Sequence, residues 1–100
     1  MKFEDKFRDF LLTRFRSGRT GKSLTPKVAS DVISRCRFLE RTVEIELGPN
    51  TFPSEKAYER LCDVVRIKSK DFGASPARPY AYNQHLYSVR IYRLFLSKRA

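Results

Sequence analysis

Residues Leu24–Val43, LTPKVASDVISRCRFLERTV, combine a helix-start signal with a regular spacing of apolar residues. Thr25 followed by Pro26 predicts a helix start, because threonine caps helices well and proline tolerates the first helical position. The apolar residues that follow recur at spacings of three and four, which predicts a helix over residues 25–43 with one buried face. That face carries Val28, Ala29, Val32, Ile33, Cys36, Leu39 and Val43.

The opposite side of this predicted helix carries small hydroxyl groups and cations. Its members recur at the same helical spacing, and they are Lys27, Ser30, Ser34, Arg37 and Arg41. Such a row is either a solvated helix face or a surface that binds anions such as phosphate. Phe38 lies beside the row, where it could stack on a base or ribose or be covered by a neighbouring helix.

Three further segments show helical apolar periodicity, at about residues 2–16, 54–69 and 80–98. The last of them has apolar residues on nearly all sides, which indicates a helix buried on most sides or partly used as an interface. A chain of 100 residues with 41% hydrophobic residues is long enough for one domain with a modest core. The sequence therefore predicts a single all-α domain, a compact four-helix bundle.

The connection SGRTGKSL, residues 17–24, predicts a flexible loop, because it combines glycines, hydroxyl groups and cations without an apolar period. It superficially resembles a nucleotide-binding loop, but that motif needs the spacing G-x-x-x-x-G-K-[ST] after a strand. Here Gly18 precedes Gly21 by only three positions and follows a predicted helix, so nucleotide binding is rejected. Arg19 and Lys22 could instead touch the phosphates of a nucleic-acid backbone.

The charge balance is the strongest global feature. The chain holds 21 Lys and Arg against 11 Asp and Glu, a net charge of +10 at pH 7. Its pI is about 10.1, which favours a polyanionic partner, most often nucleic acid, over a merely soluble basic protein. Residues 1–22 carry seven basic and three acidic groups, and residues 80–100 carry four basic groups and no acidic one. If the two ends meet in space, they should form the most positive surface.

Several function classes are not expected. The N-terminal segment MKFEDKFRDF is too charged for a signal peptide, and no apolar run approaches the roughly 20 residues that span a bilayer, so a cytoplasmic protein without a membrane partner is expected. Cys36 and Cys62 are interpreted as buried free thiols. His85 is the single histidine and has no second ligand or nucleophile at a recognisable spacing. We therefore expect no enzyme, no metal and no cofactor.

Two segments together carry a resemblance to a known family. The run LTPKVASDVISRCRFLE (residues 24–40) is followed by a loop, a third helix and the pattern Tyr82-x-x-x-Leu86-x-x-Val89-Arg90-x-Tyr92-x-x-Phe95-Leu96. This arrangement resembles the N-terminal core-binding (SAM-like) domain of tyrosine recombinases, the phage integrase family. The resemblance covers most of residues 3–97 and rests on helix-start chemistry and apolar spacing.

The resemblance implies a small helical bundle that clamps duplex DNA, mainly through phosphates, in DNA integration and recombination. Carried onto matching positions, the DNA-facing residues would be Thr25, Lys27, Ser30, Ser34, Arg37 and Arg41, with Arg90 and Arg93 added from the last helix. The family's catalytic residues lie in a separate domain, so this chain would be either a fragment of a recombinase or a stand-alone protein on the same bundle.

Two functions remain open from the sequence. One is a non-catalytic DNA-binding module, for which six to eight phosphate contacts would give a salt-dependence slope on the order of −5 to −7. The other is a protein-interaction or self-association module that uses the last helix. The residues of that helix without an obvious place in a four-helix core are Tyr80, Tyr87, Ile91 and Leu94. The sequence does not separate DNA from RNA.

Overall fold

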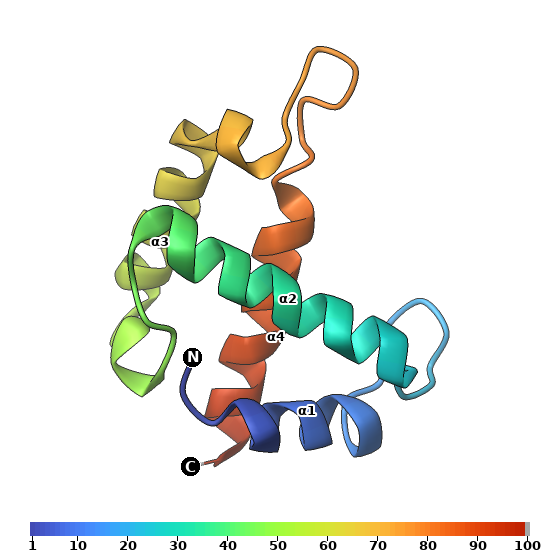
Figure 1. Cartoon of the computed structure of the whole chain (residues 1–100). Helices are drawn as coiled ribbons and strands as arrows, with labels where there is room; N and C mark the ends of the chain where they lie inside the picture. Colours follow the sequence, from blue (N-terminus) through green and yellow to red (C-terminus); the bar gives the residue numbers. More distant parts are fainter. Residues whose placement is uncertain (100) are drawn as a thin grey trace.

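The computed structural model describes residues 1–99, with the side chain of Arg99 left out, and these residues form a bundle of four α-helices without a β-strand (Figure 1). The helices are α1 (Glu4–Thr13), α2 (Pro26–Val43), α3 (Glu55–Ile67) and α4 (Asn83–Arg99). Two short 3-10 turns, η1 (Pro49–Thr51) and η2 (Ser69–Phe72), lie on either side of α3. The predicted all-α bundle is confirmed.

Local chemistry sets the ends of α2 where the sequence predicted them. Thr25 is extended, and its Oγ1 accepts a hydrogen bond from the N–H of Val28 at 3.3 Å, so it caps the helix that Pro26 begins. The helix ends at Val43, because Glu44 turns into the left-handed region at φ 58° while its N–H still bonds to the carbonyl of Glu40.

The other three helices are placed correctly but begin or end at different residues than predicted. The first ends at Thr13 instead of residue 16, because the chain turns there and Phe15 N–H bonds back to the carbonyl of Phe10. The third is capped by Ser54, whose Oγ accepts from Ala57 N–H, and after Ile67 it gives way to η2. The last begins at Asn83 instead of residue 80, because residues 80–82 form turns with bonds from residue i+3 to residue i.

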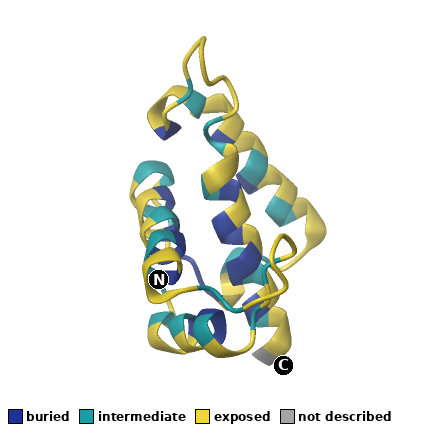
Figure 2. Cartoon of the chain, turned by 90° about the vertical axis from the view of Figure 1, so that its right-hand side faces the viewer, coloured by how far each residue is buried: buried dark blue, intermediate teal, exposed yellow. Residues whose placement is uncertain are grey.

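The core forms where α2 crosses α4 and α1 packs against both of them (Figure 1). Phe7 and Tyr92 meet edge to face at the centre, with ring centroids 5.0 Å apart, and Phe95 lies 5.3 Å from Phe7. Figure 2 shows the buried residues on the helix sides that face the interior. α3 is attached more lightly, and of its side chains only Leu61 and Val65 are buried. The bundle therefore leaves the outer face of α2 and one side of α4 open.

The first two residues of the chain are bonded to the end of α2 and to the segment that follows it. The N-terminal amine forms an ion pair of 2.9 Å with Glu40, and the N–H of Lys2 bonds to the carbonyl of Leu47 at 2.8 Å. The buried hydroxyl of Tyr92 donates to the carbonyl of Lys2 at 2.6 Å. These bonds hold residues 44–48 against α4, which explains why a segment without regular structure has a fully buried Leu47.

Candidate nucleic-acid interface

The outer face of α2 presents part of the predicted cationic row to solvent. Lys27, Ser34 and Arg41 are exposed, on the side of the helix opposite the buried residues Val32, Cys36 and Leu39. Neither Lys27 nor Arg41 forms an ion pair with any residue that the structure describes. Two cations and a hydroxyl group are therefore free to meet an anionic partner along this face.

The remaining two members of the row, Ser30 and Arg37, have partners on α1. Arg37 pairs with the carboxylate of Glu4 through both Nε and Nη2, and its Nε lies 2.7 Å from Oε1. Ser30 is half-buried and its Oγ accepts a hydrogen bond of 2.9 Å from Nη1 of Arg8. The reason is that α1 packs along the edge of α2, so these positions meet partners from the first helix.

The connection from α1 to α2 brings more cations to the start of α2. The N–H of Gly21 bonds to the carbonyl of Ser17 at 2.7 Å, and Ser17 N–H bonds to Lys22 O at 3.0 Å, so the predicted flexible loop is a hydrogen-bonded turn. Gly21 has φ +70°, a value that glycine adopts without strain. Figure 1 shows this loop beside the first turns of α2. Arg19, Lys22 and Thr25 are all exposed there.

Phe38 is both packed and partly accessible. Its ring lies 5.6 Å from that of Phe72 in η2 and 5.2 Å from that of His85 in α4, and 36% of the residue is exposed. The guanidinium of Arg41 lies 6.0 Å from the Phe38 ring centroid. The neighbouring elements thus cover most of this aromatic side chain, which was one of the two alternatives that the sequence left open.

His85 occupies the inner side of this aromatic cluster. Its ring lies tilted against Phe38 and edge to face with Phe72, and its Nδ1 is buried without a hydrogen-bond partner within the described residues. Burial lowers the pKa of His85 below its ordinary value, and the charge of Arg35 lowers it further. A neutral imidazole in this position acts as a packing group.

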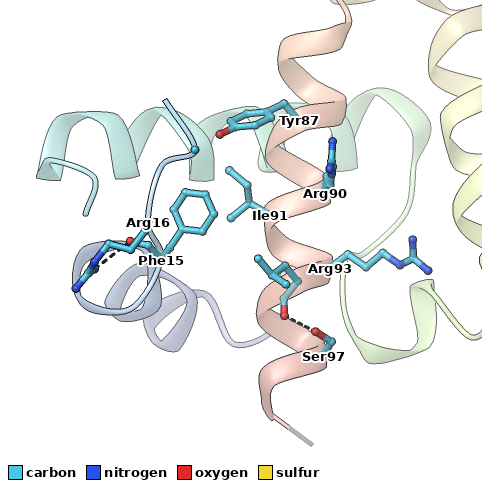
Figure 3. A pocket seen from close by; sticks show the side chains of 9 residues that line it. Phe15, Arg16, Tyr87, Arg90, Ile91, Arg93 and Ser97 are labelled. Carbon is cyan, nitrogen blue, oxygen red and sulfur yellow. Dashed lines mark hydrogen bonds between the residues drawn. The ribbon is translucent and has the colours of Figure 1, made fainter. Parts of the chain in front are cut away.

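Arg90 and Arg93 do not join the cationic face of α2. The side of α4 that packs inward carries Val89 and Tyr92, and Arg90 lies on its exposed outer side. Arg93 extends toward α3 (Figure 3), where it pairs with Glu55 and lies 4.4 Å from the Tyr58 ring centroid. The hydrogen bond from Arg93, followed by its charge, lowers the pKa of Glu55. Arg90 and Arg93, which the resemblance added to the DNA-facing residues, thus lie apart from the cationic row of α2.

The four apolar residues that were predicted to lack a core position, at and before the last helix, also need one correction. Tyr80, Tyr87 and Leu94 are exposed by 68%, 48% and 41%, as their lack of a core position predicted. Ile91 is exposed by only 3%, so it belongs to the core. It is buried because α4 and the end of α1 converge there, and Figure 3 shows Phe15 and Ile91 on the same side of α4.

The described residues contain no group of three or more His, Cys, Asp or Glu side chains that could hold a metal ion. Cys36 is a buried free thiol, as predicted. Cys62 is also a free thiol but is only half-buried, so the prediction that it is buried was wrong. No described helix is both long enough and apolar enough to cross a membrane.

The sequence did not predict that Arg8 of α1 contacts Ser30 of α2. Its neighbour Ser30 lies 22 positions further along the chain, so only the packing of the two helices reveals their contact. The available signal was that Arg8 follows the buried Phe7 directly on α1, next to the apolar face that must meet α2.

We compared the chain with known proteins and found no relative. No match to the chain was found among models of protein families, curated proteins or solved structures. The likeness to the core-binding domain of tyrosine recombinases accordingly rests on the residue patterns alone.

Proposed function

We propose that this chain is a non-catalytic DNA-binding module that holds the phosphate backbone of a duplex against the outer face of α2 and the preceding loop. One observation carries the proposal. Four exposed cations without a carboxylate partner among the described residues follow one another from the loop onto α2, and they are Arg19, Lys22, Lys27 and Arg41.

The physical basis is the neutralisation of phosphates. Each Lys or Arg that contacts a phosphate releases condensed counterions, which supplies most of the affinity at low salt. Hydroxyl groups then fix the register on the backbone. Thr25 and Ser34 offer such groups between the cations, and the net charge of +10 attracts the duplex from a distance.

The resemblance to the core-binding domain of tyrosine recombinases supports the same surface. That resemblance implies that the start and outer face of the second helix meet DNA. We therefore propose a DNA-clamping role of the kind used in recombination and integration. Arg37, Arg90 and Arg93 are left out of the proposed contacts, because two of them pair with carboxylates and the third lies on the far side of α4.

The test compares two double variants with equal charge change. Lys27→Glu with Arg41→Glu removes two proposed contacts, whereas Lys56→Glu with Arg60→Glu changes two exposed cations of α3. Binding of a fluorescent duplex is measured by anisotropy, and circular dichroism checks the fold. We expect at least about a hundredfold loss for the α2 pair, from two lost phosphate contacts and two new repulsions, and less than about a fivefold loss for the α3 pair.

The salt dependence provides a second measurement. With about four phosphate contacts the slope of log K against log salt should be close to −4, which is shallower than the sequence alone suggested. Equal losses for the two double variants, or binding that does not change with salt, would overturn the proposal. Single-stranded DNA and duplex RNA of the same length, measured in parallel, show which nucleic acid the face prefers.

A further inference from the structure

A second open surface lies on α4, on the side that faces away from α2. It is a groove of about 600 Å³ between α4 and the end of α1 with its following loop. We call it the α4 groove. Its lining consists of Phe15, Arg16, Gly18, Tyr87, Arg90, Ile91, Arg93, Leu94 and Ser97. Nothing in the proposed DNA contact uses this groove.

The middle of the α4 groove is apolar. Figure 3 shows the side chains of Phe15, Tyr87 and Ile91 on the same side of α4. Leu94 also lines the groove. Tyr87 and Leu94 remain 48% and 41% exposed. Exposed apolar residues that gather in a hollow with a polar rim are typical of a protein-interaction site.

The rim of the α4 groove is cationic. Neither its lining nor that of the adjoining hollow, which is formed by Phe10, Arg14, Phe15, Arg16, Leu94 and Lys98, contains an aspartate or glutamate. Arg93 is neutralised by Glu55, whereas Arg14, Arg16, Arg90 and Lys98 have no ion pair with the described residues. A ligand that fills this groove should therefore combine apolar anchors with flanking negative charge.

We propose that the α4 groove binds an acidic amphipathic helical segment of a partner protein. Leucine and phenylalanine side chains of such a segment, at helical spacing, would contact Phe15, Tyr87 and Leu94, and flanking carboxylates would face Arg16 and Arg90. A second copy of this chain fits less well, because its charge of +10 would oppose the cationic rim. A nucleic-acid strand fits less well too, because the exposed side chain of Leu94 offers an aliphatic group where bases prefer aromatic stacking.

This arrangement separates two binding surfaces. The inward side of α4 packs on α2, so the α4 groove and the outer face of α2 lie on opposite sides of this helix pair. Both can then be occupied at once. The chain would join DNA to an acidic protein, a role that the proposed DNA contact alone does not include.

The probe is a synthetic amphipathic peptide with leucine and phenylalanine at i and i+4 spacing and glutamates on its flanks. It is added to the full chain labelled with ¹⁵N, and amide shifts are recorded. Two control peptides replace either the apolar anchors by alanine or the glutamates by lysine. We expect the shift changes to centre on Phe15, Tyr87, Arg90 and Leu94, and both control peptides to bind at least about tenfold more weakly, because each loses one class of contact.

Matched variants test the two halves of the groove. Leu94→Ser removes an apolar contact, and Ile67→Ser is its control because Ile67 is an 84% exposed residue of α3. Arg90→Glu reverses a rim charge, and Arg60→Glu makes the same change on α3. Each groove variant should weaken the probe peptide about tenfold or more, and neither control more than about twofold. All four positions are exposed, and circular dichroism confirms that each variant folds.

Several outcomes would overturn the inference: no binding of the probe peptide up to about 1 mM, shift changes away from the α4 groove, or equal losses in groove and control variants. Single-stranded oligothymidine that shifts the same amides more strongly would assign the groove to nucleic acid. Concentration-dependent shifts of these amides without peptide would assign it to a second copy. Duplex binding by the Leu94→Ser variant, measured alongside, shows separately whether the proposed DNA contact holds.

Discussion

The guanidinium group of Arg37 forms a two-point ion pair with the carboxylate of Glu4, 33 positions away in the chain. The pair lies at the edge between α1 and α2, about one helical turn from the free cation Arg41 of the outer face. An exposed pair of this kind stabilises a fold by no more than about 1 kcal/mol. Its larger effect is on the surface charge, because it neutralises a cation in the middle of the predicted row.

Glu4→Gln should therefore strengthen binding to duplex DNA. The change frees Arg37, so we expect about a threefold higher affinity at low salt and a salt slope steeper by about 0.9, the contribution of one phosphate contact. Asp63→Asn is the matched control, because it frees Arg66 from an exposed pair on α3. An equal gain with Asp63→Asn would mean that only the total charge matters.

Removing the hydroxyl of Tyr92 should destabilise the fold without changing the outer face of α2, which we propose binds DNA. The hydroxyl is buried and donates a hydrogen bond of 2.6 Å to the carbonyl of Lys2. The carbonyl of Leu47 is a second acceptor, 3.3 Å from the same hydroxyl oxygen. Tyr92→Phe should lower the free energy of unfolding by about 1–3 kcal/mol, because a buried hydrogen bond is lost. Urea denaturation measures the loss. Tyr80→Phe, at a 68% exposed position, should change stability by less than about 0.5 kcal/mol.

The position of His85 predicts a stability that falls in weak acid. Its pKa in the folded protein lies below the ordinary value of about 6.5, so the unfolded chain binds a proton at higher pH than the folded chain does. The stability that this site contributes is complete above pH of about 6.5 and is lost as the pH falls through the folded pKa.

Two measurements check this prediction. The single histidine allows its imidazole to be titrated by NMR without overlap, and the midpoint should lie below 6.5. The free energy of unfolding of the natural chain should decrease between pH of about 7 and 5 more steeply than that of a His85→Gln variant. Arg35→Gln should raise the midpoint, because the charge of Arg35 contributes to the lowered pKa. A midpoint above 6.5 would contradict the buried placement.

The two thiols should react at very different rates. Burial raises the pKa of Cys36 to about 12, and the charge of Glu40 adds to the effect, so almost no thiolate exists at neutral pH. Cys62 is only half-buried. With a chromogenic disulfide reagent we expect one thiol to react in the folded chain and the second only on unfolding. A Cys62→Ser variant that still reacted rapidly when folded would show that the core around Cys36 opens.

The elements of the fold were largely predictable from the sequence, and the reason is visible in α2. Thr25 and Pro26 specify its start, and the spacing of its apolar residues specifies its buried face. Both features depend only on residues that are close in the sequence. The prediction failed at the ends of α1 and α4, where Arg14 and Tyr80 belong to turns. Both residues have acceptable helical propensity, so the tertiary position of the adjoining loops decided their conformation.

The candidate site was predictable only in part. Lys27, Ser34 and Arg41 lie where the helical period placed them. The pairing of Arg37 with Glu4, and of Arg93 with Glu55, depends on how helices distant in the sequence pack against each other. The same packing buries Ile91 and leaves Tyr87 and Leu94 at the edge of a groove.

The helices, the buried face of α2 and the excess of positive charge follow from local spacing, cap chemistry and composition, so the amino-acid sequence is enough to predict them. Which cations remain free and which side of α4 stays open depend on how helices distant in the sequence pack together. A salt bridge or a groove forms between side chains of different helices, and their separation is set by the packing of the whole core. The separation of the exposed cations of α2 from the open side of α4 is therefore a property of the fold.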